Sequence, residues 1–362
     1  NSVEGKGYIW YEDSDSAQWV QFHPDTSIAS NTPYTYPGGV EQTLQQRLEQ
    51  YVSVKDFGAK GDGVTDDTAA IQAAVNSGAT CVCFPEGRYL LKSSDGIVVP
   101  SNTTLIGQNA VVVQPTRPNS PSADTVTNPS SCAFKVGEES QNITFERLII
   151  EGPQGSTPFT KEDTTVARYN ISGIYVVGQY DQVYLDGIAY PTIAPSKNIA
   201  IKNCRIYGFD QSGVLADYVD YFSVNDCHIY NCCRDGVRTY GVEQFNISDN
   251  TIHDIFPGFA GTGAAPNLNA YGVACTRVYK SGNNDGTLAP FRDTAYGIVD
   301  NNKVRQVPTW KGLDSHGGEY ITFSNNVVKG TYVGIGLAQG GVRNDTGISS
   351  PSHIIVSGNI LR

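Results

Sequence analysis

Hydrophobic positions in the second half of the chain recur with a fixed period. The pattern apolar-x-apolar-x-Asn/Asp-x-x-apolar begins at Ile199, Phe222 and Phe245, and so returns about every 23 residues. Further copies begin at Ile143, Gly297, Ile321 and Ile354. The alternation within each copy predicts a strand with one buried face. The fixed spacing predicts the stacked coils of a β-solenoid.

A second signal recurs in each coil, and in two adjacent coils it follows the first strand at the same interval, from Ile199 to Gly213 and from Phe222 to Gly236. It is a glycine followed by an aliphatic residue, as in Gly173-Ile174, Gly213-Val214, Gly236-Val237, Gly272-Val273, Gly312-Leu313 and Gly334-Ile335. Because both signals keep one register, we predict an all-β fold, a parallel β-helix with three strands per coil. The Asn or Asp at the fifth pattern position is expected at a bend, where a short polar side chain bonds to nearby backbone groups.

The first fifty residues have a different character and form a separate segment. Aromatic residues are followed by a Pro- and Gly-rich stretch, and then by apolar residues at helical spacing, Val40, Leu44, Leu48 and Tyr51. So short a helix is unstable alone, so we expect it to pack against another element, such as its own symmetry mates. A flexible linker with accidental periodicity is the alternative. Residues 1–50 are therefore interpreted as a linker or neck.

Residues 51–91 are expected to close the first coil. Strand signals on both sides surround a Gly-rich turn and a helix whose apolar side is formed by Ile71, Ala74 and Val75. Thr65 or Asp66 is expected to cap this helix, so the neighbouring Asp66 and Asp67 are interpreted as capping groups and not as a catalytic pair. A helix here covers strand edges that would otherwise be exposed. The body of the β-helix is assigned to residues 92–362.

Composition narrows the choice of partners. The net charge of −11, with no basic run to offset it, argues against a nucleic-acid or anionic-membrane surface, and no stretch is apolar enough to insert into a membrane. The 8 cysteines have no metal or disulfide spacing, so we expect buried thiols, synthesis in a reducing cytoplasm, and neither metal nor cofactor. The chain contains no Met and stops at Arg362 directly after a coil signal, so we expect its native N- and C-terminal parts to be missing.

Two motifs carry a resemblance to a known family. The run from Val54 to Ala74, followed by Phe84-Pro-Glu-Gly-Arg-Tyr89, resembles the opening of pectate-lyase-like right-handed β-helix proteins. With residues 39–54 in front, it resembles bacteriophage tailspike proteins more narrowly. The resemblance implies a homotrimer in the virion, linked to the phage tail through its N-terminus and made in the host. It also implies a depolymerase that acts on a bacterial capsule or on the O-antigen of lipopolysaccharide, with polysaccharide-binding sites on the β-helix face or between subunits.

Alternation within the Gly-marked strands selects the candidate site residues. Positions two and four after each glycine point outward, which predicts a solvated outer stripe of Asp217, Arg238, Tyr240, Asp314 and His316. Asp217 and Asp314 lie three coils apart, roughly 14 Å at the usual strand spacing. That is too far for a carboxylate pair acting on one bond.

The segment 310–319 is the densest source of chemistry. Asp314 and Glu319 are predicted as catalytic acid and base, with His316 orienting or replacing either one. Trp310 is predicted to stack on a sugar, Arg238 to hold a sugar carboxylate, and Asp217 and Tyr240 to contact substrate. Residues 253–271 and 277–296 are predicted to be insertions on either side of this region, and they supply His253, Asp254 and Asp293.

Several functions remain open from the sequence. We favour a hydrolase of a bacterial capsular polysaccharide or lipopolysaccharide. A lyase acting on a uronic acid by β-elimination is an alternative, for which Arg238, Lys311 and Tyr240 supply charge neutralisation and a base. A receptor-binding spike without catalysis and a secreted plant-wall enzyme are further alternatives. The paired-Asp, Gly-His-Gly and Arg-Ile-Lys signatures of polygalacturonases are absent.

Overall fold

The computed structural model describes most of the chain. The residues that it describes are 7–12, 17–22, 33–34, 39–93, 95–116, 131–159, 171–177, 194–257, 269–277, 293–343 and 347–362. The predicted insertions fall largely on residues 258–268 and 278–292, which lie outside this set. His253 and Asp254 do not belong to an insertion, because they lie within strand β23 (Thr251–Phe256).

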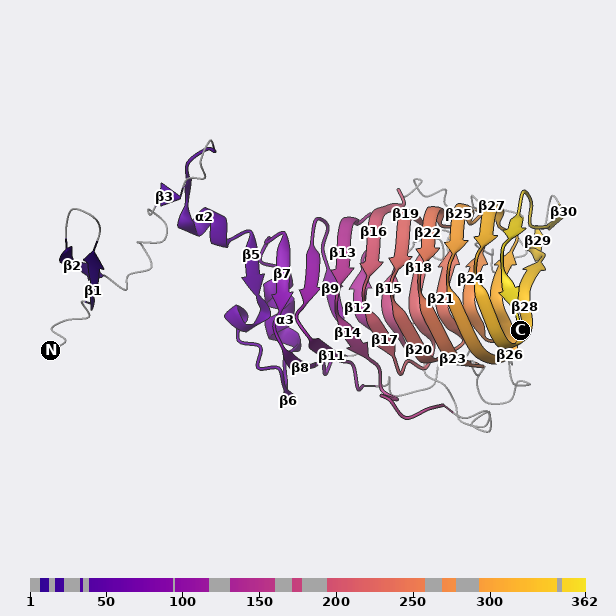
Figure 1. Cartoon of the computed structure of the whole chain (residues 1–362), viewed down its shortest axis with the longest axis horizontal. Coiled ribbons are helices and arrows are strands. Elements are labelled where there is room, and N and C mark those ends of the chain that lie inside the picture. Colours follow the sequence, from indigo (N-terminus) through magenta and orange to yellow (C-terminus); the bar gives the residue numbers. More distant parts are fainter. Residues whose placement is uncertain are drawn as a thin grey trace, which may run out of the picture.

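The first face of the molecule is a 10-stranded parallel sheet that runs along the whole stack (Figure 1). Its strands, in chain order, are β5 (Tyr51–Ser53), β7 (Cys81–Phe84), β10 (Thr104–Gly107), β13 (Gln141–Glu146), β16 (Ser196–Lys202), β19 (Val219–Asn225), β22 (Glu243–Ser248), β25 (Ala295–Asp300), β27 (Glu319–Ser324) and β31 (Ile355–Ser357). The predicted capping region and the body are therefore continuous, since β5 and β7 belong to the same sheet as the later coils.

The second and third faces are connected into one 16-stranded sheet because β26 (Lys303–His316) and β28 (Val327–Ala338) continue around the corner between them. The second face also contains β6 (Asp62–Asp66), β8 (Gly87–Leu90), β11 (Ala110–Val113), β14 (Ile149–Glu151), β17 (Arg205–Tyr207), β20 (His228–Cys233), β23 and β32 (Ile360–Leu361). The third face also contains β9 (Ile97–Val99), β12 (Ser131–Val136), β15 (Ile171–Val176), β18 (Ser212–Asp217), β21 (Asp235–Tyr240) and β24 (Tyr271–Thr276).

The strand register confirms the predicted repeat. Ile199 pairs with Phe222, and Phe222 pairs with Phe245 in the next coil. In the third face, Val214 pairs with Val237, which pairs with Val273. These side chains are buried in one continuous core. Apolar residues of successive coils thus lie directly above one another, and the parallel β-helix with three strands per coil is confirmed.

Two columns of polar residues form the bend between the first and second faces. The predicted bend positions have left-handed backbone conformations, with φ near +55° at Asn203, Asp226 and Asn325. The residues that follow them form a ladder that the sequence analysis did not anticipate. The ladder consists of Asn250, Asn302, Asn326 and Asn359. Each side-chain amide donates to a core-strand carbonyl, and each of the first three also donates to the side-chain oxygen of the next Asn. The buried amides thereby obtain hydrogen-bond partners, and they do so only when successive coils are stacked in this register.

The N-terminal end of the stack is closed by helix α3 (Thr68–Val75), as predicted. Ile71, Ala74 and Val75 are part of the core. The side-chain amide of Gln72 donates to the Val98 carbonyl at 2.8 Å and accepts from the Val98 N–H at 2.9 Å. Gln72 therefore replaces a missing strand at the edge of β9, where free backbone groups would otherwise invite pairing.

The two aspartates before this helix, Asp66 and Asp67, have different hydrogen-bond partners. Asp66 accepts from the Thr68 N–H at 3.1 Å, and so bonds at the helix start as expected. Asp67 does not bond at the helix start. Its carboxylate accepts from the backbone N–H groups of Lys60 and Gly61, at 2.6 and 3.0 Å, and so holds the turn before the helix. The 3-10 helix η1 (Val54–Phe57) precedes this turn.

The neck segment contains small elements. Antiparallel pairs are formed by β1 (Gly7–Glu12) with β2 (Ala17–Phe22), and by β3 (Pro33–Tyr34) with β4 (Gln42–Thr43). A third antiparallel pair, β29 (Gly340–Arg343) with β30 (Gly347–Ser349), does not belong to the neck and lies near the C-terminal end of the chain. Helix α2 (Leu44–Leu48) is shorter than the predicted spacing, and a capping box at Thr43 begins it. Val40, Leu48 and Tyr51 are 85%, 56% and 60% exposed, so this apolar side is uncovered in the single chain.

The cysteines agree with the expectation of buried thiols. All eight are free thiols, and six of them are buried. Within the described residues, no helix has the length and hydropathy needed to cross a membrane.

Candidate active site

The candidate site lies on the outer side of the third face, where a glycine bends strands β18, β21, β24, β26 and β28. A Cβ on Gly236 would meet Ile252 Cγ2 at 2.5 Å and the Gly272 carbonyl at 2.6 Å, so this position faces the packed core. The register also skips the glycine, since Asp235 and Val237 pair with the next coil while Gly236 does not. The residue before the glycine and the residue two after it consequently share the outer side. This geometry places two ion pairs between residues three apart in the sequence.

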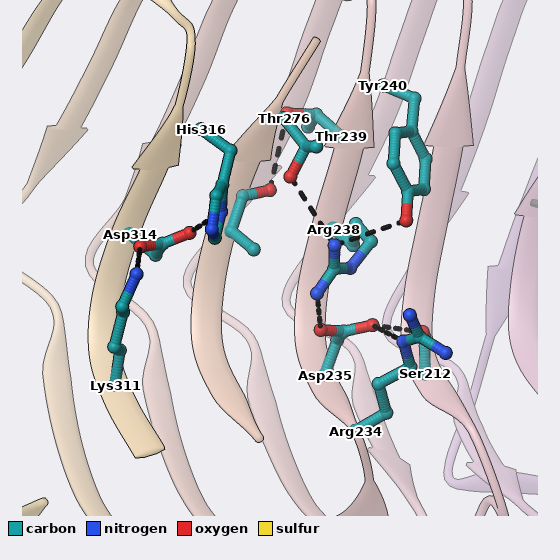
Figure 2. A network of polar contacts seen from close by, with 11 residues as sticks. Ser212, Arg234, Asp235, Arg238, Thr239, Tyr240, Thr276, Lys311, Asp314 and His316 are labelled. Atoms are coloured by element: carbon teal, nitrogen blue, oxygen red, sulfur yellow. Dashed lines mark hydrogen bonds and ion pairs between the residues drawn. The ribbon is translucent and has the colours of Figure 1, made fainter. Parts of the chain in front are cut away.

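The first pair forms the centre of the segment that the sequence singled out. The Lys311 ammonium donates to Asp314 Oδ1 at 2.6 Å. His316 Nδ1 lies against the other carboxylate oxygen, Oδ2. Asp314 is fully buried, whereas the His316 side chain is 19% exposed. Figure 2 shows Asp314 between the two partners, with His316 on the side of the neighbouring strand β24.

Small residues in the adjacent coils make room for this pair. Asp314 is aligned with Ala274 on one side and with Gly336 on the other. A Cβ on Gly336 would lie 2.5 Å from Lys311 Cδ and 3.0 Å from Asp314 Oδ1. The Lys311 side chain can therefore fold over its partner only because position 336 has no side chain.

The second pair lies two coils away, around Arg238. Its guanidinium donates to Asp235 Oδ1 at 2.7 Å, to the Tyr240 hydroxyl at 3.1 Å and to Thr276 Oγ1 at 3.4 Å. Ser212 donates to the other Asp235 oxygen at 3.0 Å (Figure 2). Burial disfavours the charge on Arg238, but the Asp235 carboxylate outweighs it and keeps the pKa of Arg238 above its usual value.

Tyr271 joins the two pairs. The Arg238 guanidinium carbon lies 4.6 Å from the centre of its ring and Lys311 Nζ lies 5.9 Å from it, within the range of cation–π attraction. The ring also meets His316 edge-on, with centroids 5.9 Å apart. Burial raises the pKa of Tyr271 to about 12, and the nearby Arg238 opposes that shift. Tyr271 therefore stays neutral at ordinary pH.

The predicted stripe points outward, as expected, but it is not solvated. Asp217 and Tyr240 are fully buried, and Arg238 is 4% exposed. The expectation of a solvent-exposed stripe is therefore wrong for these residues. Strand alternation gives the direction of a side chain, but it does not reveal what covers that side. The guanidinium of Arg238 is already bonded on several sides, so a sugar carboxylate could reach it only if these contacts rearranged.

The remaining candidates lie around the segment's two ends. Trp310 is half-buried and stacks on Tyr332, with ring centroids 6.2 Å apart, and Tyr332 is 74% exposed. Glu319 opens β27 on the first face, beyond the bend at Gly317. Among the described residues no hydrogen bond or ion pair joins Glu319 to Asp314 or His316. The structure thus brings Asp314 and His316 together, with Trp310 beside Lys311, and leaves Glu319 on another face.

Asp235 and Tyr271 were not selected by the sequence analysis, and Lys311 was selected only for the lyase alternative. All three directly precede a marker glycine. Counting strict alternation through that glycine turns them inward. A signal in the sequence could have revealed this. Strict alternation would have buried the polar or aromatic residues at this position in an apolar core without partners, and these residues are Ser212, Asp235, Tyr271 and Lys311.

The arrangement suits proton transfer. An imidazole whose Nδ1 lies against a buried carboxylate presents Nε2 as a proton acceptor, and the carboxylate stabilises the imidazolium that forms. Lys311 adds a positive charge on the opposite side of Asp314. Within the described part of the chain, no group of three or more His, Cys, Asp or Glu side chains is arranged to hold a metal ion.

Comparison with known proteins agrees with this architecture. The family model described as "Rhamnogalacturonase A/epimerase, pectate lyase-like" matches residues 51–287. The pre-neck appendage protein of Bacillus phage phi29 is 31% identical over 213 residues, which cover 51% of this chain and 23% of that protein. A capsule K30/K69-specific depolymerase of Klebsiella phage K5-2 is 28% identical over 192 residues, which cover 52% of this chain and 21% of that protein.

A solved structure supports the fold in particular. The tailspike protein of Escherichia coli bacteriophage HK620, in complex with a hexasaccharide, superposes with a TM-score of 0.57 at 14% identity, covering 93% of this chain and 56% of that chain. The present chain spans less than a quarter of the two curated relatives. The family match extends over more than half of it, and the resemblance found in the sequence is confirmed: the chain belongs to the pectate-lyase-like family of rhamnogalacturonase A and epimerase proteins.

Proposed function

We propose that this chain is the β-helix of a bacteriophage tail appendage that binds a bacterial surface polysaccharide and depolymerises it beside a uronic acid by β-elimination. The names of its relatives support the virion location and the class of substrate, since they include a phage appendage protein and a capsule depolymerase. The observation that carries the chemistry is the contact of His316 with buried Asp314, next to Lys311.

In this mechanism His316 Nε2 removes the proton on the sugar carbon next to the carboxylate. The electron pair forms a carbon–carbon double bond as the glycosidic carbon–oxygen bond breaks. The imidazolium, held by Asp314, then returns the proton to the leaving oxygen. The Lys311 ammonium stays bonded to Asp314, and its positive charge beside the site favours the negative charge that builds up on the sugar carboxylate.

The contacts support elimination over hydrolysis. Hydrolysis by either stereochemical route uses two carboxyl groups on opposite sides of the bond. Asp314 is fully buried behind His316 and Lys311, and Glu319 opens a strand of a different face. Hydrolysis was favoured by the sequence because spacing alone placed Asp314 and Glu319 close together.

The test uses purified chain with uronate-containing capsular polysaccharides, and follows ultraviolet absorbance together with product mass. Elimination produces an unsaturated, absorbing end, whereas hydrolysis adds the mass of water. His316→Ala should lower the rate by about 10²- to 10⁴-fold, as expected for loss of a general base. His353→Ala is the matched control, because His353 is an exposed histidine at the first face that stacks on Tyr320.

Two results would contradict the proposed elimination. Products heavier by one water, together with a large rate loss in Glu319→Gln, would replace elimination by hydrolysis. Intact polysaccharide after long incubation with saturable binding would make the chain a receptor-binding spike without catalysis.

We also propose that the chain forms a homotrimer through its neck and attaches to the tail on that side. Leu48 of α2 and the flanking residues Val40 and Tyr51 support this, because they are exposed in the single chain although their apolar spacing predicts a covered side. Light scattering should give three copies per particle. The Val40→Asp and Leu48→Asp double variant should be a monomer; a trimer in that variant would remove the neck from the interface.

A further inference from the structure

The outer side of the second face carries a different set of side chains from the candidate active site. Basic residues from three of five successive coils occupy it, and we call this set the basic ribbon: Arg205, Lys303, Arg305 and Lys329. All four are exposed. Lys303 and Arg305 belong to the first half of β26, whose second half carries Asp314 and His316. The ribbon therefore lies one corner of the β-helix away from the candidate active site.

The basic ribbon gathers bases that have no acidic partner among the described residues. Elsewhere some exposed bases are paired, as Lys202 is with Glu146 at 3.3 Å and Arg88 with Glu151 at 2.6 Å, while others, such as Lys197 on the first face, have no ion pair among the described residues. Among the described residues, no ion pair involves any member of the ribbon. In a chain of net charge −11, four unpaired bases on one face form a local positive field.

Between these bases lies a rigid row of rings. Tyr207 stacks on Tyr230 with centroids 4.9 Å apart, and Tyr230 stacks on His253 at 5.1 Å. His253 Nδ1 lies 2.6 Å from Asp254 Oδ2, and its Nε2 lies 2.7 Å from Nε2 of His228. Because the rings cover one another's faces, they present their polar edges along this side of the molecule.

The row and the ribbon share one register. Arg205 aligns with His228 in the next coil, and His253 aligns with Arg305, which aligns with Lys329. From the coil of Arg205 to the coil of Lys329 there are four steps, which span roughly 19 Å at the usual strand spacing. That length accommodates several consecutive sugar units of an extended chain.

We propose that the basic ribbon and its row of rings form a second binding site, separate from the candidate active site, for a polysaccharide that carries carboxylates. The unpaired Arg and Lys groups would contact the carboxylates, and the edges of Tyr230 and His228 would exchange hydrogen bonds with sugar hydroxyls. A single-stranded nucleic acid fits less well, because such ligands stack their bases on free aromatic faces and these faces are occupied. The proposal does not depend on the role of His316.

The test measures binding of fluorescently labelled oligomannuronate and oligogalacturonate to the His316→Ala variant, in which turnover is not expected. Wild-type ribbon residues should give saturable binding that weakens with salt. The double variant Lys303→Gln and Arg305→Gln should bind at least tenfold more weakly. Lys197→Gln with Lys202→Gln is the matched control, since it removes two exposed bases from β16 on the first face and should bind like the parent.

Three results would overturn the proposal. The first is equal binding by the ribbon variant and the control variant. The second is absence of saturable binding for both polyuronates, or equal binding of a neutral dextran of matched length. The third is tighter binding of single-stranded DNA than of either polyuronate. Because these are binding measurements, they leave the elimination reaction to be judged by its own product analysis.

Discussion

The second and third faces of this β-helix are built from the same repeat, yet their outer sides are opposites. On the third face the charges are buried and paired, as in Asp235 with Arg238 and Lys311 with Asp314. On the second face the basic ribbon is exposed and has no acidic partner among the described residues. A regular backbone therefore fixes where side chains point, while the cover over each face decides whether a charge is structural or available to a ligand.

Burial also sets the energetic cost of each arrangement. A buried charge must be paired, because the penalty for leaving it in a low-dielectric interior is several kcal/mol. An exposed charge keeps its water and contributes little to stability. Substitutions on the two faces should consequently differ in size, and a sequence of experiments can test that difference.

The largest effect is expected from Asp235→Ala. The substitution leaves the Arg238 guanidinium buried without its carboxylate, so the free energy of unfolding should fall by about 3–5 kcal/mol. Urea unfolding followed by tryptophan fluorescence measures it. In Asp235→Leu with Arg238→Met both charges are gone, and most of the loss should be recovered. A loss below about 1 kcal/mol in the single variant would mean that the third face is wetter than its contacts indicate.

A smaller effect is expected from Gly336→Ala. The new Cβ would displace Lys311 from Asp314, because Lys311 Cδ lies 2.5 Å from its position. The end of a flexible side chain can move, so folding should be nearly unchanged, while polysaccharide cleavage should slow by about ten- to hundredfold through misplacement of the catalytic groups. Gly137→Ala is the control, since its Cβ would meet only Ser140 Oγ at 3.7 Å. An unchanged rate in Gly336→Ala would separate Lys311 from catalysis.

The sequence predicted the fold far better than it predicted this contrast. Alternation and period gave the register of the coils from Ile143 onward, because a one-residue shift would turn Ile199 or Phe222 out of the core. The same alternation failed at Asp235 and Lys311, where the bend at the following glycine turns the side chain outward. Alternation also could not predict exposure, because Tyr240 is buried in a cluster with Cys132, Tyr175 and Leu215, which lie in other coils.

The ring row on the second face should make stability depend on pH. Burial, then His253 and the nearby Arg205 and Arg305, lower the pKa of His228 to about 4. The unfolded chain takes up this proton near the usual value of 6.5, so stability is full above about pH 6.5 and falls as the pH drops towards 4. Because the site is partly solvated, the loss should be no more than about 1 kcal/mol. Urea unfolding at both pH values should show this loss in wild type and a reduced loss in His228→Gln; equal losses would mean that another group titrates.

The smallest effect is expected from Arg305→Gln, and its sign is informative. Arg305 and Lys329 are direct partners on neighbouring parallel strands, and like charges at such positions repel. Removing one should raise the free energy of unfolding by about 0.2–0.5 kcal/mol in low salt, and the gain should vanish near 1 M salt, where the screening length is about 3 Å. Urea unfolding at both salt concentrations measures this, with Lys197→Gln on the first face as the control. A decrease in stability would mean that Arg305 has a structural partner; an increase would mean that the ribbon is maintained at a cost to folding, as expected of residues kept for a ligand.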